Sequence, residues 1–301
     1  MNEFQRNMPF RTAEEFLSYL SPVSNAIWRE RNHVFRGQMD MSLPLTPSAH
    51  RMGTDVSVST FYGEHDVTIG EQVAFEKAVL LRFLEACDHA GLQVPDDSEA
   101  LRRSLKQFDR SRSGNYNWPT AEFHRVLAFA QHHGVPTCLL DWSRNPFVAS
   151  YFAASSVLTW KLTEANCSAR MAVWVLDTRC QAINVIEAPG GTSPYLAAQS
   201  GLFTVSMIKN ESETLESFYE TRLDEDLSPG HTDPEPLQCV SLPASEASEV
   251  LHILSLMGIT GAKLFPGYEG VSRDVKDWAR ARRLSAGPVE NSHRYEINQF
   301  I

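Results

Sequence analysis

The chain has 301 residues, with 27 Lys and Arg against 37 Asp and Glu, so its formal net charge is −10. An apolar fraction of 43% excludes a disordered chain, and no apolar run approaches the roughly 20 residues that cross a bilayer. The acidic balance disfavours non-specific nucleic-acid binding, and five cysteines without a C-x-x-C pair disfavour disulfides and a zinc site. The first residues lack the apolar segment of a signal peptide, so we expect a reduced, cytoplasmic protein with no metal and no membrane partner.

The first elements in chain order are a short helix and a strand. The helix is expected at 12–20, where Thr12 is a suitable N-cap and Glu15 stands at the capping-box position. The apolar run 33–38 contains a glycine near its end and predicts a strand that leads into a turn. Residues 43–70 are rich in Pro, Ser, Thr and Gly, which indicates a long irregular connection.

Helical periodicity dominates the next part of the chain. Residues 70–90 carry apolar side chains at helical spacing and are followed by a glycine, which predicts a helix that ends there. The polar, Arg-rich stretch 96–113 predicts a helix or a partly mobile segment, and 120–131 predicts a second amphipathic helix. We interpret 70–131 as a helical insertion in a domain of residues 33–283, preceded by an N-terminal helical segment, 1–32.

A buried strand at 137–142 leads directly into an apolar helix. Asn145 and Pro146 are suited to the N-cap and first position of that helix, and 171–177 predicts a continuous, β-branched central strand. The pattern therefore predicts a single mixed α+β domain with short strands and a polar tail at 284–301. The remaining expected elements are strands at 182–187, 201–205, 239–243 and 262–266, helices at 211–226, 244–257 and 270–283, and a loop at 228–236.

Several segments of the chain carry a resemblance to a known family. They are FRGQ at 35–38, QHHGVPTCLLDWSRNPFVASYFAA at 131–154, MAVWVLD at 171–177, AAQSGLFTV at 197–205 and MGITGAKLFPGYEGVSRDVK at 257–276. In this order they resemble the FRG domain, a family named for its Phe-Arg-Gly motif. The chain departs from the family at Cys138, where a basic residue is usual, so any contact of that residue with an anionic ligand would be altered here.

The pattern is also similar, more distantly, to ADP-ribosyltransferases. Those enzymes place an Arg or His on an early strand, Ser or Thr at the end of another, then a helix rich in Ala, Tyr and Phe, and a Glu or Gln on a later strand. Here Arg36, Ser143, Tyr151 and Gln199 match these places. The resemblance implies a split-sheet core flanked by helices, NAD as the substrate, and Arg36, Tyr151 and Gln199 as catalytic residues.

Arg36 and the two residues after it form the first expected contact with NAD. The guanidinium suits a diphosphate, whereas the structural alternative is an ion pair with Glu76 or Asp141. Gly37 permits a close backbone approach or a positive φ, or marks a simple turn. Gln38 follows it in the motif and is expected to bind the same ligand.

The block at 131–154 supplies the second expected contact with NAD. His132 and His133 close a helix, where they either complement its dipole or hydrogen-bond a nucleotide, and because they are adjacent we expect at most one in the site. Asp141 and Ser143 come at the end of a buried strand, a place from which polar side chains commonly reach ligands. The alternatives are an ion pair of Asp141 with a neighbouring arginine and support of the next helix by Ser143.

The two other catalytic candidates each have a structural alternative. Tyr151, or Phe152 beside it, is expected to stack on a nicotinamide or adenine ring, but an aromatic residue at this helical spacing is more commonly part of the core. Gln199 occupies the position of an acid, although an amide does not stabilise an oxocarbenium ion as a carboxylate does. Glu187 or Glu269 could supply the missing carboxylate.

The sequence thus leads to three hypotheses about function. The first is NAD-dependent ADP-ribosyl transfer to a macromolecule (RNA, DNA or protein) by a bacterial toxin of a toxin–antitoxin or phage-defence system, with an antitoxin protein as partner. The second is a non-catalytic nucleotide-binding or protein-interaction module, which the amide of Gln199 favours. The third is nucleic-acid handling by a basic cluster, for which a solvated helix face is the alternative; its members are Arg102, Arg103, Lys106, Arg110 and Arg112.

Overall fold

The computed structural model describes residues 7–51, 54–63, 67–106, 118–160, 168–180, 183–187, 194–205 and 236–285. The helix expected at 211–226 and most of the loop expected at 228–236 lie outside these ranges. The strands are β1 (Asn7–Pro9), β2 (His33–Gln38), β3 (Leu139–Ser143), β4 (Arg170–Asp177), β5 (Asn184–Ile186), β6 (Gly201–Val205) and β7 (Leu237–Pro243). The α-helices are α1 (Ala13–Leu20), α2 (Val58–Tyr62), α3 (Ile69–His89), α4 (Glu99–Lys106), α5 (His124–His132), α6 (Pro146–Thr159), α7 (Pro194–Gln199), α10 (Ala247–Leu256), α11 (Gly261–Leu264) and α12 (Tyr268–Ser285). Short 3-10 helices are η1 (Ala26–Glu30), η2 (Ser48–His50), η3 (Ala121–Phe123) and η5 (Ala244–Glu246).

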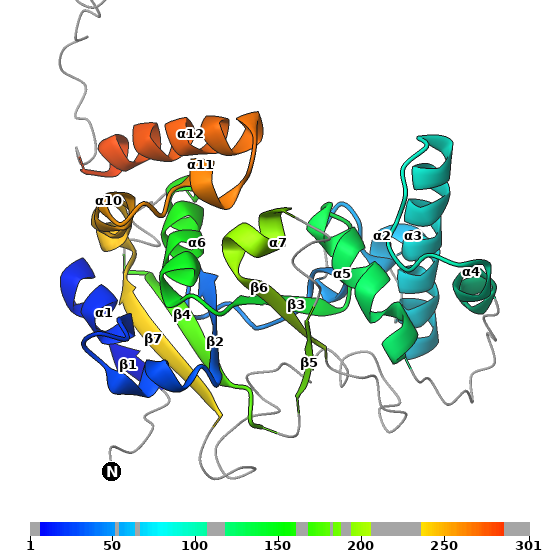
Figure 1. Cartoon of the computed structure of the whole chain (residues 1–301), viewed down its shortest axis with the longest axis horizontal. Coiled ribbons are helices and arrows are strands. Elements are labelled where there is room, and N and C mark those ends of the chain that lie inside the picture. The colour runs from blue at the N-terminus through cyan, green and yellow to red at the C-terminus, as the bar shows by residue number, and fades with distance from the viewer. Residues whose placement is uncertain are drawn as a thin grey trace, which may run out of the picture.

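The strands form one seven-stranded mixed sheet in the order β1-β7-β4-β2-β3-β6-β5 (Figure 1). Only the β1–β7 pair is parallel among the described strands. β2 pairs with β4 along its whole length, but it meets β3 at a single register position, Phe35 opposite Ser143. The sheet is therefore divided at the β2–β3 junction into two parts, with an opening between these neighbouring strands. The combination of helices with a mixed sheet confirms the predicted α+β class.

Successive side chains of a strand point to opposite faces of the sheet, and in its larger part the apolar side chains on both faces are buried. On one face, Val173 and Val175 of β4 pack with the inner sides of α1, α6 and α10. On the other face, Ala172, Trp174 and Leu176 join apolar residues of β3, β6 and β7. α12 lies across α6 and α10 on the outside of this helical layer (Figure 1).

α6 lies directly on β2, and Gly37 makes that contact possible. A Cβ at position 37 would stand 2.0 Å from the backbone oxygen of Ala149 and 2.6 Å from the backbone nitrogen of Ala153. Of the alternatives for Gly37, the structure shows the close backbone approach, while its φ is not among the positive ones. Asn145 caps α6 as predicted, because its Oδ1 accepts a hydrogen bond from the backbone N–H of Phe147.

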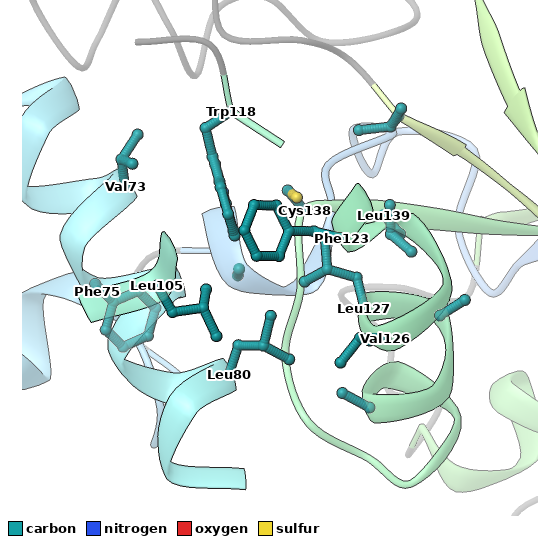
Figure 2. Close-up of a cluster of buried hydrophobic side chains, with 14 of the residues drawn as sticks. Val73, Phe75, Leu80, Leu105, Trp118, Phe123, Val126, Leu127, Cys138 and Leu139 are labelled. Carbon is teal, nitrogen blue, oxygen red and sulfur yellow. The ribbon is translucent and has the colours of Figure 1, made fainter. Parts of the chain in front are cut away.

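α2 to α5 form a helical unit at one end of the sheet with an apolar cluster of its own (Figure 2). Figure 2 shows Trp118 and Phe123 beside Cys138, and Leu139 belongs to the same cluster, so this cluster continues into the segment that becomes β3. The carboxylate of Glu76 is buried in the same unit, where it accepts hydrogen bonds from other side chains. The donors are Gln72 Nε2 at 2.6 Å and Trp118 Nε1 at 2.8 Å, and His50 Nε2 lies 2.9 Å away.

Two expectations about individual elements are wrong, and one helix was not expected. Residues 262–266 are not a strand, because α11 forms a helical turn there, with Gly261 tightly packed against the backbone of Asp274. The N-terminal segment is not only helical, since residues 7–9 form an edge strand beside β7. The pattern at 194–199 gave no signal for α7, which is only six residues long.

Candidate active site

A cleft of about 810 Å³ lies where β2 and β3 separate. Its walls come from β2, β3, the end of α5, α6 and α7, with further residues from the turn before α12 and from α12 itself. Of the predicted site residues, the cleft brings together seven: Arg36, Gly37, His132, His133, Asp141, Ser143 and Gln199. A local break in sheet pairing therefore gathers residues from three segments that are far apart in the sequence.

Arg36 lies on β2 with only 9% of its side chain exposed. Its Nη1 donates to the backbone oxygen of Asp141 at 2.8 Å and lies 2.8 Å from that residue's Oδ2. Its Nε is buried and has no hydrogen-bond partner among the described residues. Buried donors are usually satisfied, so an unpartnered nitrogen at this position is unusual.

Asp141 is held in place from two sides. Besides the pair with Arg36, its Oδ1 accepts a hydrogen bond from Gln131 Nε2 at 3.1 Å. Enclosure in the cleft acts to raise the pKa of this carboxyl, but the charge and hydrogen bond of Arg36, with Arg51 nearby, hold the pKa below its usual value. Since 64% of the side chain is nevertheless open to solvent, the ion pair is screened. Asp141 is thus an ionised partner of Arg36.

Both adjacent histidines border the cleft, so the expectation that at most one could do so is wrong. They stand at the end of α5, where neighbouring side chains diverge by about 100° rather than pointing to opposite faces as in a strand. His132 contacts the ring of Tyr195, with centroids 4.9 Å apart. Burial, and then the neighbouring His133, lowers the pKa of His132, which favours the neutral imidazole at pH 7.

Ser143 and Gln199 line the cleft while holding its walls together. Ser143 Oγ donates to the backbone oxygen of Gln199 at 2.7 Å and accepts from the backbone N–H of Asn145 at 3.0 Å. The amide Nε2 of Gln199 donates to the backbone oxygen of Leu264 at 3.1 Å. These bonds connect β3, α7 and α11, so the side chain of Gln199 is already engaged.

Three residues singled out in the sequence lie away from the cleft. Tyr151 is 2% exposed and donates its hydroxyl to Asp277 Oδ2 at 2.6 Å, and burial, together with this acid, raises its pKa. Gln38 contacts Trp174 Nε1, at 2.6 Å, on the other side of β2. Cys138 is buried beside Glu76, and burial raises the pKa of its thiol well above the usual value. The departure from the family at this position therefore does not alter the cleft.

Of the two aromatic residues weighed for stacking, Phe152 lines the cleft and Tyr151 does not, because one position along a helix turns the side chain by about 100°. Two arginines at the cleft were not foreseen from the sequence. Arg51 reaches the cleft from the irregular connection after η2, and Arg273 places its guanidinium 4.2 Å from the ring centroid of Phe265. Phe265 and Arg273 belong to the segment 257–276, whose motif was the available signal.

The two carboxylates proposed to replace Gln199 are separated by the structure. Glu269, at the start of α12, lines the cleft. Glu187 does not, and it forms an ion pair with Arg144. Of the two, only Glu269 is therefore available to a ligand in the cleft.

The basic cluster of α4 is largely neutralised by its own neighbours. Arg102 pairs with Asp88 and Asp97, and Arg103 with Glu99. Arg110 and Arg112 lie outside the described residues. The described part of this cluster fits the alternative of a solvated helix face.

The described residues contain no group of three or more His, Cys, Asp or Glu side chains that could hold a metal ion. None of the helices within the described ranges has the length and apolar character needed to cross a membrane. The side chains that line the cleft include arginines, histidines, aromatic rings and a few carboxylates.

Comparison with known proteins gives one match. No curated protein and no solved structure matches the chain. Residues 31–161 match the model of the FRG domain, a range that extends from just before β2 to the end of α6 and includes both strands at the opening of the sheet. The chain therefore carries an FRG domain, as its motifs predicted.

Proposed function

We propose that the cleft binds NAD and that the protein transfers ADP-ribose from it to a macromolecule. The observation that carries this proposal is the place of Arg36, an arginine fixed by Asp141 in the wall of the cleft at the opening of the sheet. Arg51 and Arg273 add positive charge to the same cleft, which suits a diphosphate. The rings of Tyr195 and Phe265 provide apolar faces for a base.

In this reaction the bond between ribose and nicotinamide breaks, and an acceptor nucleophile forms the new bond to the ribose and loses its proton. Positive charge develops on the ribose, so a nearby carboxylate lowers the barrier. Asp141 is committed to Arg36 and Gln199 is an amide, which makes Glu269 the carboxylate we assign to this role. Arg36 and Arg51 would hold the diphosphate.

The acceptor in this proposal is RNA, DNA or protein. Because such modification damages the cell that makes the enzyme, we propose a toxin of a toxin–antitoxin or phage-defence system, restrained by an antitoxin protein.

The proposal is tested by incubating the protein with NAD labelled in the adenylate part and with cell lysate. We expect released nicotinamide and labelled macromolecules, and we expect Arg36→Ala to reduce both at least 100-fold, in keeping with the loss of a charged group that positions the substrate. Arg125→Ala is the matched control, because Arg125 forms an exposed ion pair with Asp96 outside the cleft. Transfer by Arg36→Ala at the rate of the unchanged protein would refute the assignment.

The engaged amide of Gln199 favours a second candidate function, a module that binds a nucleotide without turning it over. Calorimetry with NAD and ADP-ribose, followed by analysis of the products, separates the two functions. Binding without nicotinamide release supports the second candidate, and nicotinamide release supports the enzyme.

A further inference from the structure

α12 turns its apolar side chains outward and a polar face toward the rest of the protein. Val271, Val275 and Trp278 are each more than half exposed. Among the residues of α12 whose side chains are described, the buried ones are Gly270 and Asp277. A surface helix that packs by the hydrophobic effect has the opposite arrangement. The rotation of α12 about its own axis is therefore set by other contacts.

The polar face of α12 carries side chains at intervals of four residues. Glu269, Arg273 and Asp277 follow one another at this spacing, so they lie on the same side of the helix in successive turns. Glu269 and Arg273 line the cleft, whereas Asp277 is buried against α6, with 6% of the residue exposed. A contact that fixes Asp277 thus also fixes the direction in which the other two side chains point.

The contact at Asp277 is a buried hydrogen bond to α6. Tyr151, which is 2% exposed, donates its hydroxyl to Asp277 Oδ2 at 2.6 Å, a length in the range of charge-assisted bonds. On the other side of the carboxylate, Arg280 Nη1 lies 3.9 Å from Asp277 Oδ1. α11 closes over the same hydroxyl, because a Cβ at Gly261 would stand 2.9 Å from it. The hydroxyl of Tyr151 therefore lies where α6, α11 and α12 meet.

We propose that Tyr151 and Asp277 are positioning residues, whose hydrogen bond holds α12 in the rotation that directs Glu269 and Arg273 into the cleft. Without this bond, the hydrophobic effect favours a rotation that buries the outward apolar side chains, and such a rotation turns Glu269 away from the cleft. The role in catalysis rests on the proposed function of Glu269, whereas the fixing of α12 can be measured without NAD.

Tyr151→Phe tests the hydrogen bond, because it removes the hydroxyl and keeps the ring in the core. We expect the backbone amides of α12 to exchange with deuterium about tenfold faster, the factor that corresponds to losing a hydrogen bond to a charged group. Tyr19→Phe is the matched control, because it removes a tyrosine hydroxyl that donates to Gln238 Oε1 at 3.3 Å outside the cleft. Equal exchange of α12 in the two variants would overturn the proposal.

The rate of nicotinamide release in a single turnover is the functional readout. Tyr151→Phe should lower this rate at least about tenfold, because Glu269 no longer stands beside the reacting ribose. The dissociation constant of NAD should change only a few-fold, since Arg36 and Arg51 keep their places. A loss of overall stability alone would leave the rate per folded molecule unchanged.

These measurements separate failure of the positioning role from failure of the proposed function. An unchanged rate in a Tyr151→Phe variant whose α12 exchanges faster would overturn the positioning role. If the unchanged protein releases no nicotinamide, the proposed function fails, and the exchange of α12 alone decides whether the pair fixes this helix.

Substitution of the acceptor separates the hydrogen bond from the charge. Asp277→Asn keeps an acceptor for the hydroxyl and should retain most of the rate and the slow exchange of α12. Asp277→Ala removes the acceptor and should match Tyr151→Phe in both measurements. Equal losses in the two variants of Asp277 would overturn the role of the hydrogen bond, because charge alone would then hold the helix.

Discussion

At the scale of single residues, Arg36 combines a structural contact with a free donor. An arginine with a purely structural role would satisfy all its buried nitrogens, yet here the two contacts with Asp141 both come from Nη1. The ion pair orients the guanidinium, and Arg36 still lines the cleft. The two alternatives for Arg36, ion pair and ligand contact, are therefore compatible.

Glu269 gives the sharpest functional prediction at this scale. Under the proposed function, Glu269→Gln should lower the rate of nicotinamide release about 100-fold or more while NAD still binds, because a carboxylate that stabilises developing positive charge acts mainly in the transition state. Glu187→Gln, at a carboxylate that is paired with Arg144 outside the cleft, serves as the control. Equal rates for the two variants in a single-turnover assay would assign the role to another group.

Glu76 predicts how stability depends on pH. Burial acts to raise the pKa of this carboxyl, but His50, Gln72 and Trp118 outweigh it and hold the pKa below the ordinary value of 4.5. A group whose pKa is lower in the folded state stabilises the protein above its unfolded pKa, and this contribution is lost as the pH falls through the folded pKa. The free energy of unfolding should therefore decrease below about pH 4.5.

The same carboxylate can be tested by substitution. Glu76→Gln should lower the free energy of unfolding at pH 7 by about 3 kcal/mol, because it removes a buried carboxylate that accepts hydrogen bonds from Gln72 and Trp118. It should also flatten the decrease at acid pH, as measured by urea denaturation at several pH values. An unchanged pH slope in this variant would mean that other carboxylates cause the decrease.

At the scale of elements, the contact of α6 with β2 sets the geometry of the cleft. Gly37→Ala places a Cβ 2.0 Å from a backbone oxygen of α6, so helix or strand must move. We expect a loss of about 3 kcal/mol or more in the free energy of unfolding, at the upper end of overpacking costs. Gly258→Ala is the comparison variant, because it introduces backbone strain without a clash: Gly258 has a φ of 76°, and no atom lies within 4 Å of an added Cβ.

The expected cost of Gly258→Ala is only about 1 kcal/mol. Chemical denaturation of both variants measures the difference. Equal losses would show that α6 adjusts to the added methyl group without cost.

At the scale of the whole molecule, the helical unit and the sheet share one continuous apolar interior at β3. Leu139 belongs to β3 and also to the cluster of the helical unit. We therefore expect Leu127→Ala, a truncation in the helical unit at a residue that is 1% exposed, to cost about 2–5 kcal/mol and to destabilise the sheet as well. Thermal transitions followed by tryptophan fluorescence and by far-ultraviolet circular dichroism should shift together. Two separate transitions would show that the units unfold independently.

The sequence predicted most elements because their signals are local. The cap at Asn145, the helical spacing of α3 and the continuous apolar run of β4 need no knowledge of distant residues. The errors at β1 and at 262–266 arose where short segments take their structure from a distant neighbour: β1 from β7, and α11 from α12.

The sequence by itself determined the FRG domain, the α+β class and several of the residues that line the cleft, because motifs and periodicity are written along the chain. Only the tertiary structure decided which side chains meet. It directs the side chain of Phe152 into the cleft and that of its neighbour Tyr151 into the core. It also brings Arg51 and Arg273 to the cleft from distant segments. The physical reason is that side-chain direction and long-range contact depend on how the elements pack against one another, which no local pattern specifies.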